Sequence, residues 1–191
     1  WAVKDLSRIY FSKESLPVPA DYDGNGSCDL AVFDRTSGRW RIAGRSVFYF
    51  GASGDRPVPA DYDNDGTEEP AVFRPSSGMW AVRDYSRWYF GGEDDLPLPG
   101  VYRWYGAERS GIRRGASRAL SAVYRRAGGL WAIRGLTRFY LGTASDTPLR
   151  GNFSGDGLDQ PAIFRPSIGL WAVPPVTRVY FGAAGDSPVS R

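Results

Sequence analysis

The segment "PVPADYDNDGTEEPAVFRPSSGMWAVRDYSRWYF", residues 57–90, is one complete copy of a unit that recurs along this chain. It contains four short stretches, Pro-Val-Pro-Ala-Asp, Ala-Val-Phe-Arg, Trp-Ala-Val and Arg-Trp-Tyr-Phe, which are separated by residues such as Gly, Pro, Ser and Asp. Short β-branched and aromatic stretches between such residues indicate β-strands joined by turns. "SSGM" lies where a tight hairpin would join the second strand to the third. No stretch of the chain has helical periodicity, so the unit is predicted to be four strands.

Tryptophan marks the repeat most clearly. It occurs at Trp1, Trp40, Trp80, Trp131 and Trp171, spaced 39, 40, 51 and 40 residues apart. Four strands in a repeat of about 40 residues are typical of a β-propeller blade. One such small sheet cannot cover both of its faces, so blades stack around an axis. The sequence therefore predicts an all-β propeller, with Trp40, Trp80, Trp131 and Trp171 packed between blades.

The number of blades depends on the two ends of the chain. Residues 1–11 repeat the last two strands of a unit, and residues 186–191 repeat part of the first, but no Ala-Val-Phe-like strand accompanies them. Pairing of the two ends would close a ring and remove exposed edges, so we expect one domain of five blades over residues 1–191. The missing strand leaves an alternative, in which an open blade pairs with a neighbouring chain to give oligomers or filaments. The complete blades are expected at residues 17–50, 57–90, 97–141 and 148–181.

The chain begins with Trp1 and not with Met, which indicates a processed or excised segment of a longer protein.

Three loops after the first strand share a pattern of oxygen-bearing side chains at positions 1, 3, 5 and 9, with glycine at position 6. Carboxylates crowded in this way repel one another unless a cation lies between them. A flexible cage of six to eight oxygens, with a backbone carbonyl from position 7, suits calcium better than magnesium. Two calcium sites and a possible third are therefore predicted. The candidate ligands are Asp21, Asp23, Asn25, Ser27 and Asp29; Asp61, Asp63, Asp65, Thr67 and Glu69; and Asn152, Ser154 and Asp156.

The alternative is that these loops are acidic turns without metal, because Asp, Asn and Gly favour turns in any case. The loop at residues 152–160 has only Asp156 as a carboxylate at a ligand position, since Asp159 is one residue out of register. The corresponding loop of the third repeat has Arg103 where a ligand should be, so no ion is expected there.

At these residues the chain resembles the FG-GAP/VCBS-type repeats of integrin α-subunit propellers and related bacterial extracellular proteins. Phe50-Gly51, Phe90-Gly91 and Phe181-Gly182 are similar to the Phe-Gly element, and the loops that begin at Asp21 and Asp61 are similar to the calcium loop of that family. The resemblance covers nearly the whole chain. It implies a calcium-bearing propeller, secreted or on the cell surface, that acts in adhesion or ligand binding. Propellers of this family often have seven blades.

Several kinds of function are not expected from the composition. Histidine is absent, so the commonest general base and metal ligand is missing, and no nucleophile has a recognisable activating partner. The single Cys28 cannot form an internal disulfide or a multi-cysteine zinc site. We therefore do not expect an enzyme. No run of apolar residues is long enough to span a membrane. The net charge of +3 comes with no recognised nucleic-acid-binding motif, so nucleic acid is not an expected partner.

Aromatic and basic residues outside the repeat pattern are the candidate ligand-binding residues. Trp88 replaces the Phe, Ile or Val of other repeats, and a basic insertion over residues 103–118 accounts for the 51-residue spacing. Exposed aromatic rings can stack on sugars, whereas an arginine-rich loop suits an anionic partner or is simply solvated. The expected function is an extracellular calcium-stabilised binding or adhesion module with a glycan or protein ligand. The candidate residues are Trp88, Arg103, Trp104, Tyr105, Arg113 and Arg114.

Overall fold

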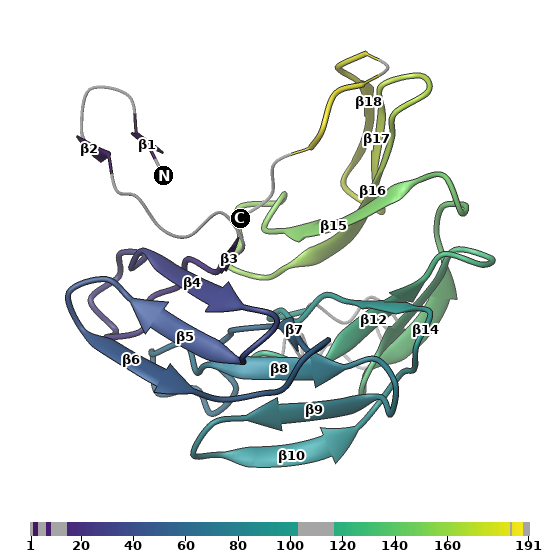
Figure 1. Ribbon diagram of the computed structural model, residues 1–191. Helices are drawn as coiled ribbons and strands as arrows, with labels where there is room; N and C mark the ends of the chain where they lie inside the picture. The colour runs from purple at the N-terminus through teal and green to yellow at the C-terminus, as the bar shows by residue number, and fades with distance from the viewer. Residues whose placement is uncertain (1, 4–6, 9–14, 103–116, 184, 189–191) are drawn as a thin grey trace.

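The fold consists of four antiparallel sheets of four strands that follow one another around a common centre in chain order (Figure 1). The computed structural model describes residues 2–3, 7–8, 15–102, 117–183 and 185–188. None of these residues is helical, and the all-β propeller arrangement predicted from the repeat is confirmed. No helix in the described part of the chain is long and apolar enough to cross a membrane.

Each blade runs from an inner first strand to an outer fourth strand, and each strand pairs with the next one in the chain. The first blade contains β3 (Ser15–Pro17), β4 (Ala31–Asp34), β5 (Arg39–Ile42) and β6 (Ser46–Tyr49). The second contains β7 (Arg56–Pro57), β8 (Ala71–Arg74), β9 (Met79–Val82) and β10 (Ser86–Tyr89). The third contains β11 (Asp95–Pro97), β12 (Ala122–Arg125), β13 (Leu130–Ile133) and β14 (Thr137–Tyr140). The fourth contains β15 (Thr147–Gly151), β16 (Gln160–Arg165), β17 (Leu170–Val173) and β18 (Thr177–Tyr180).

The expected number of five blades is wrong, because the described residues form four. Strands β1 (Ala2–Val3) and β2 (Ser7–Arg8) pair only with each other, and residues 186–188 form no strand. The reason lies in the strand order. The second strand of a blade pairs with both the first and the third, so the absence of an Ala-Val-Phe-like strand leaves the two ends with nothing that joins them. The remaining residues of the expected fifth blade lie outside the described part of the chain.

The core lies between the blades, as expected from the repeated tryptophans. Trp40, Trp80 and Trp131 are fully buried, and each packs its ring against the aromatic residue of the second strand, such as Phe73 beside Trp80 at a centroid distance of 5.2 Å. Trp171 is only partly buried. It belongs to the fourth blade, whose last strand is exposed at all four positions.

An ion pair between a buried aspartate and a partly exposed arginine recurs in the last three blades. Asp55 accepts hydrogen bonds from Nε and from a terminal nitrogen of Arg74 at 2.8 and 2.9 Å, and also from the backbone N–H of Ala52. The pairs Asp95–Arg125 and Asp146–Arg165 have the same two-pronged geometry. These contacts tie the connection between two blades to the second strand of the blade that follows.

Glycine is required where the hairpin turn between the second and third strands of a blade touches the connection that leaves the fourth strand. Gly78, in the turn between β8 and β9, has a φ of +68°, and a Cβ atom placed on it would lie 2.3 Å from the carbonyl oxygen of Gly91. The corresponding turn glycines of the other blades meet the carbonyl of the same Phe-Gly or Leu-Gly element. The glycine of the Phe-Gly or Leu-Gly element therefore has a structural role in this fold, because its carbonyl lies against the backbone of the hairpin turn.

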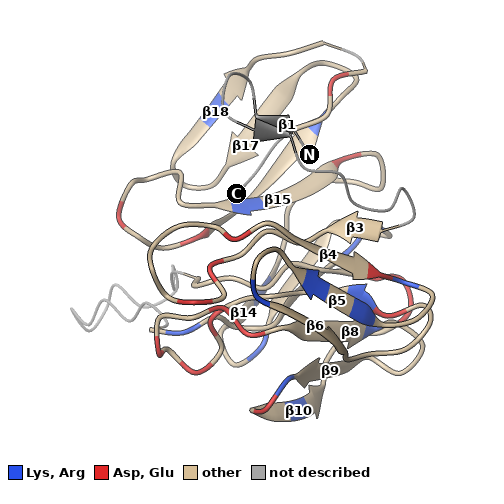
Figure 2. Ribbon diagram, turned by 60° about the vertical axis from the view of Figure 1, so that its left-hand side comes forward, with Lys and Arg blue, Asp and Glu red and all other residues tan. Residues whose placement is uncertain are grey.

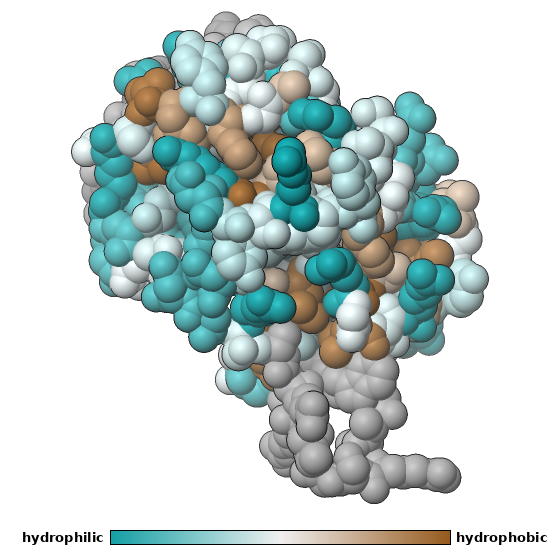
Figure 3. All heavy atoms as spheres, turned by 90° about the horizontal axis from the view of Figure 1, so that it is seen from below, coloured by the Kyte–Doolittle hydropathy of each residue, from teal (hydrophilic) through white to brown (hydrophobic). Residues whose placement is uncertain are grey.

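Acidic and basic residues occupy different parts of the fold. Figure 2 shows Asp and Glu mainly in the connecting loops, whereas Arg also lies on strands such as β5, β8, β15 and β18. On the face of the molecule in Figure 3, hydrophobic residues are divided among several separate areas by hydrophilic ones. The loops are therefore the place to look for a cation site.

Replacement of Trp80 and of Trp171 by alanine should lower the free energy of unfolding by different amounts, because Trp80 is fully buried between two blades and Trp171 is only partly buried. Trp80→Ala is expected to lower the free energy of unfolding by about 3–5 kcal/mol, the usual cost of emptying a large aromatic site in a core. Trp171→Ala should cost clearly less, because its ring already contacts solvent. Urea unfolding of both variants measures this, and equal losses would show that the fourth blade is covered in solution.

Candidate metal centres

The loop at residues 61–69 brings four carboxylates together. Carboxylate oxygens of Asp61, Asp63, Asp65 and Glu69 all lie within 4.8 Å of one another. Backbone N–H groups of the loop donate to these side chains: Asp63 Oδ1 accepts from Asp65 at 3.1 Å, Asp65 Oδ1 accepts from Thr67 at 2.7 Å, and both carboxylate oxygens of Asp61 accept, from Asn64 and Gly66. The Oδ2 atoms of Asp63 and Asp65 accept none of these bonds and remain for a cation. This donor set, hard and entirely oxygen, fits calcium.

The backbone of this loop is shaped for inward-pointing oxygens. Asn64 and Gly66 have positive φ angles of 68° and 91°, and Gly24 and Gly26 have the same conformation in the loop at residues 21–29. The tight turn predicted at position 6 is therefore present, with a second one at position 4.

The charge of the cluster is poorly compensated. The pKa of Glu69 is raised to about 7, first by partial burial and then by the neighbouring Asp63, Asp61 and Asp65, although the N–H of Tyr62 opposes this by donating to Glu69. A carboxyl group that resists ionisation in this way is stabilised as a carboxylate when a cation lies beside it. The electrostatics therefore agree with the donor geometry.

The loop at residues 21–29 gathers three carboxylates, from Asp21, Asp23 and Asp29. Here a cationic side chain is already present. The guanidinium of Arg45 contacts Asp23 and forms an ion pair with Asp29 Oδ1 at 3.2 Å. Since Arg45 offsets part of the charge that a metal would offset, this loop should hold calcium more weakly than the loop at residues 61–69. The spacing within the loop could not indicate this contact, because Arg45 lies 16 residues from Asp29 along the chain.

The loop at residues 152–160 is completed by an amide. Gln160 is fully buried, and its Oε1 accepts the N–H of Phe153 at 2.6 Å, just as Glu69 accepts that of Tyr62. Its Nε2 donates to Ser154 Oγ and to the carbonyl of Leu158, both at 2.8 Å. These are the acceptors at positions 3 and 7 that a metal would use. The amide N–H₂ thus takes the place of a cation, and Asn152, Ser154 and Asp156 form a loop that is held without one.

Consecutive loops are also joined across the blade boundaries. The N–H of Glu68 donates to the carbonyl of Asp21 at 2.8 Å, and the Glu68 carboxylate accepts the N–H of Asp21 at 2.9 Å. The third blade repeats the backbone bond from Ala119 to Asp61, and the fourth repeats it from Asp159 to Val101, each at 2.7 Å. We call these contacts the loop clasps. A cation that orders one loop therefore also acts on the blade next to it.

A cavity of about 350 Å³ lies beside the four-carboxylate loop. Its lining includes the carboxylates of Asp63, Asp65 and Glu69 and aromatic residues of the first two blades, among them Phe48 and Tyr85. Tyr85 is 43% exposed, whereas Arg83 covers the ring of Phe48 at 4.1 Å. The site thus combines an oxygen-rich loop with an accessible aromatic ring. The repeat alone did not single out Tyr85.

The predicted ligand-binding residues fall into two groups. Trp88 lies at the boundary of the second and third blades, where it donates to Ser121 Oγ at 2.8 Å, packs edge-on against Tyr62 and has Arg134 over its ring at 5.3 Å. These contacts occupy the ring, so Trp88 serves the blade interface. Cys28 is exposed. The other candidates, Arg103, Trp104, Tyr105, Arg113 and Arg114, lie outside the described residues.

Calcium is expected to raise the melting temperature of the protein, because a ligand that binds only the folded state stabilises it, by about 2.7 kcal/mol at a free concentration of 100 times Kd. The double variant Asp63→Asn/Asp65→Asn should lose most of this increase. Differential scanning calorimetry in excess calcium and in chelator measures both. The matched control, Glu93→Gln/Asp94→Asn, removes the same charge at exposed positions outside the loop and should keep the increase.

Arg45→Gln should tighten calcium binding at the loop of residues 21–29, because it removes the competing guanidinium. Isothermal calorimetry with calcium should then resolve two sites of more similar affinity than in the wild type. Melting that is independent of calcium in all these proteins would make both loops acidic turns.

Comparisons of the chain with protein-family models, with curated proteins and with solved structures gave no match.

Proposed function

We propose that this chain is an extracellular, calcium-stabilised binding module that recognises glycans at the cavity beside the loop of residues 61–69. One observation carries the proposal: four carboxylates that suit a hard cation adjoin a cavity with an accessible tyrosine ring. Binding and not catalysis is proposed, because the described residues of this site include no nucleophile with an activating base. The similarity of the loops to FG-GAP/VCBS repeats supports the same class of function.

The chemistry of the cavity matches a polyhydroxyl ligand. A calcium ion held by the loop would supply further coordination positions, and sugar hydroxyl oxygens are ligands of the hard kind that calcium prefers. Tyr85 offers a ring face for the apolar C–H side of a sugar, and the guanidinium of Arg83 adds hydrogen-bond donors at the wall. An extracellular setting supports the cation, since weak calcium sites of extracellular modules fill at about 10⁻⁴–10⁻³ M.

Glycan binding is expected to require both calcium and Tyr85. On a glycan array, the wild-type chain should give hits in calcium that disappear in chelator. Tyr85→Ala and Asp63→Asn/Asp65→Asn should each reduce them about tenfold or more, which corresponds to about 1.4 kcal/mol of binding free energy. Tyr140→Ala is the matched control, because Tyr140 is an exposed tyrosine of the third blade, 77% accessible and away from this cavity. An array without hits, or hits that survive chelation and Tyr85→Ala, would exclude this site.

Self-association through the fourth blade is a second candidate function, and the exposure of its outer face favours it. Val179 and Phe181 are 46% and 77% exposed, whereas their counterparts in the first blade, Phe48 and Phe50, are partly buried against the second blade. Within the described residues, no backbone hydrogen bond between Cys28 and Asn152 completes a loop clasp from the fourth blade to the first. A structural subunit that assembles through this face is therefore the alternative to a ligand-binding module.

Light scattering after size-exclusion chromatography tests assembly. If the fourth blade is an interface, the apparent mass should rise with protein concentration, and Val179→Thr/Phe181→Ser should return it to the 21.1 kDa of one chain. The control Val47→Thr/Tyr49→Ser makes a similar change at exposed positions of β6 and should leave the mass unchanged. A monomer at every concentration would remove the assembly function and leave the binding module.

A further inference from the structure

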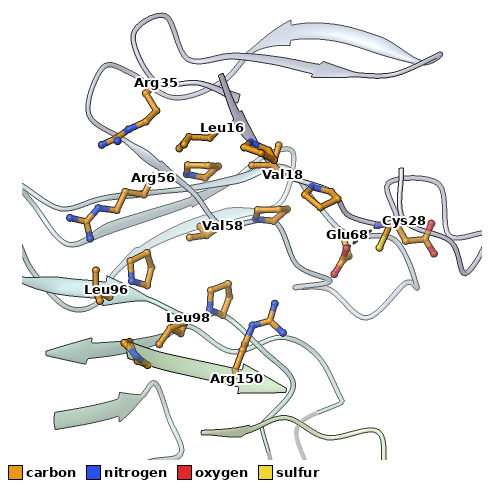
Figure 4. A pocket seen from close by; sticks show the side chains of 18 of the residues that line it. Leu16, Val18, Cys28, Arg35, Arg56, Val58, Glu68, Leu96, Leu98 and Arg150 are labelled. Carbon is orange, nitrogen blue, oxygen red and sulfur yellow. Dashed lines mark hydrogen bonds between the residues drawn. The ribbon is translucent and has the colours of Figure 1, made fainter. Parts of the chain in front are cut away.

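The inner strands of all four blades enclose a cavity of about 970 Å³ that none of the functions above uses. Its wall is formed mainly by prolines and by aliphatic residues that lie in or directly after the first strands, among them Val18, Val58, Leu96 and Leu98. Figure 4 shows Val18, Val58 and Leu98 between charged residues, with Arg35 and Arg56 towards one end and Glu68 and Arg150 towards the other. The interior is therefore apolar, and the charges lie at its mouths.

The two mouths of the cavity carry different charged residues. Glu68, Asp21 and Arg150 lie at the end where the acidic loops begin, and there Glu68 is held by the loop clasp and Arg150 pairs with Asp159. Arg35 and Arg56 lie at the opposite end (Figure 4), and Arg126 lies in the turn of the third blade that corresponds to the turn of Arg35. We call the mouth formed by Arg35, Arg56 and Arg126 the arginine mouth.

The carboxylates nearest to the arginine mouth are already paired. Asp55 and Asp95 form their two-pronged contacts with Arg74 and Arg125, and the carboxylate of Asp34 accepts hydrogen bonds from Thr36. The side chain of Arg56 is anchored because it donates to the backbone carbonyl of Asp95 at 2.8 Å. No acidic side chain among the described residues forms an ion pair with Arg35, Arg56 or Arg126. Three positive charges therefore converge on an apolar cavity.

The electrostatics of Arg56 agree with this arrangement. Burial lowers its pKa first, and the neighbouring Arg35 and Arg126 lower it further. Like charges that are close enough to act on one another bind an anion more favourably than separated charges do, because the anion relieves their repulsion.

We infer that the arginine mouth and the cavity behind it form a binding site for an organic anion, whose acidic group contacts Arg35, Arg56 and Arg126 while its apolar body lies between the first strands. Planar guanidinium groups match phosphate and carboxylate oxygens, so both head groups suit the mouth. The proline and aliphatic wall suits a ring or a short hydrocarbon, in the manner of an apolar pocket with a few polar groups that orient the ligand.

Isothermal calorimetry with phenyl phosphate and with benzoate tests the site, and the difference between them identifies the preferred head group. Inorganic phosphate and phenol are the two half-ligands, and each should bind more weakly than phenyl phosphate. Arg35→Gln/Arg126→Gln should weaken binding about tenfold or more, since charge-assisted hydrogen bonds are lost. Both side chains are exposed and form no contact that the fold needs, so the variant should fold, and circular dichroism checks this.

The matched control is Arg87→Gln/Arg138→Gln, which removes the same charge from exposed positions of β10 and β14. It should bind phenyl phosphate as the wild type does. If neither ligand binds, or if the control weakens binding as much as the variant at the mouth, the site does not exist and any affinity reflects general positive charge. If inorganic phosphate binds as tightly as phenyl phosphate, the apolar cavity takes no part and the inference is wrong. The assay contains chelator, so its result is independent of the calcium loops.

Discussion

The structure depends on the loop clasp, the backbone hydrogen bond by which each blade holds the loop of the blade before it. A four-stranded blade cannot bury both faces, so stability comes from stacking, and stacking requires a fixed distance and register between neighbours. The clasps from Glu68 to Asp21, from Ala119 to Asp61 and from Asp159 to Val101 fix that register at one end of the sheets, with lengths of 2.7–2.8 Å. At the other end, the Asp–Arg pairs, whose carboxylates are buried, tie three of the connections to the blades that they enter. The apolar core between blades then forms in the space that these two sets of contacts define.

The sequence predicted the blade, its four strands and the buried tryptophans, because these depend on local pattern and on repetition. Blade number could not be obtained in the same way. Residues 1–11 and 186–191 match parts of a unit, but a match to separate strands does not show that they can pair, and the strand that would join them is missing. Regular recurrence of an aromatic residue does not by itself indicate burial. Tyr49, Tyr89, Tyr140 and Tyr180 recur as regularly as the tryptophans, yet they are 69–77% exposed, because their positions at the end of the outer strand point away from the neighbouring blade.

In the acidic loops, residue spacing predicted which carboxylates come together but not which other side chains contact them. Spacing identified Asp61, Asp63, Asp65 and Glu69 as a group, and the fold brings their oxygens together. Spacing could not reveal that Arg45 reaches the loop of residues 21–29, or that Gln160 fills its own loop with an amide N–H₂. Gln at position 9 was a readable signal in retrospect: the same position holds a carboxylate in the other two loops, and an amide can donate where a carboxylate can only accept. The three loops thus differ in what contacts the same set of acceptors. The loop of residues 61–69 leaves carboxylate oxygens for a cation, the loop of residues 21–29 is contacted by the guanidinium of Arg45, and the loop of residues 152–160 is contacted by the amide of Gln160.

The acidic loops lie where the blades meet, and some of their carboxylates also line the central cavity. Asp21 and Glu68 belong both to the acidic loops and to the wall of the cavity, so a cation that orders the loops would also fix the acidic mouth. Arg35 and Arg126, by contrast, occupy a turn position that is proline in the second and fourth blades, Pro75 and Pro166, and no packing contact requires a charge there. The tryptophans and the Asp–Arg pairs make packing contacts or ion pairs that hold blades together, whereas Arg35 and Arg126 are exposed at a turn position that two blades fill with proline. This difference in contacts separates them from the arginine mouth, and it supports the mouth as a place for a ligand.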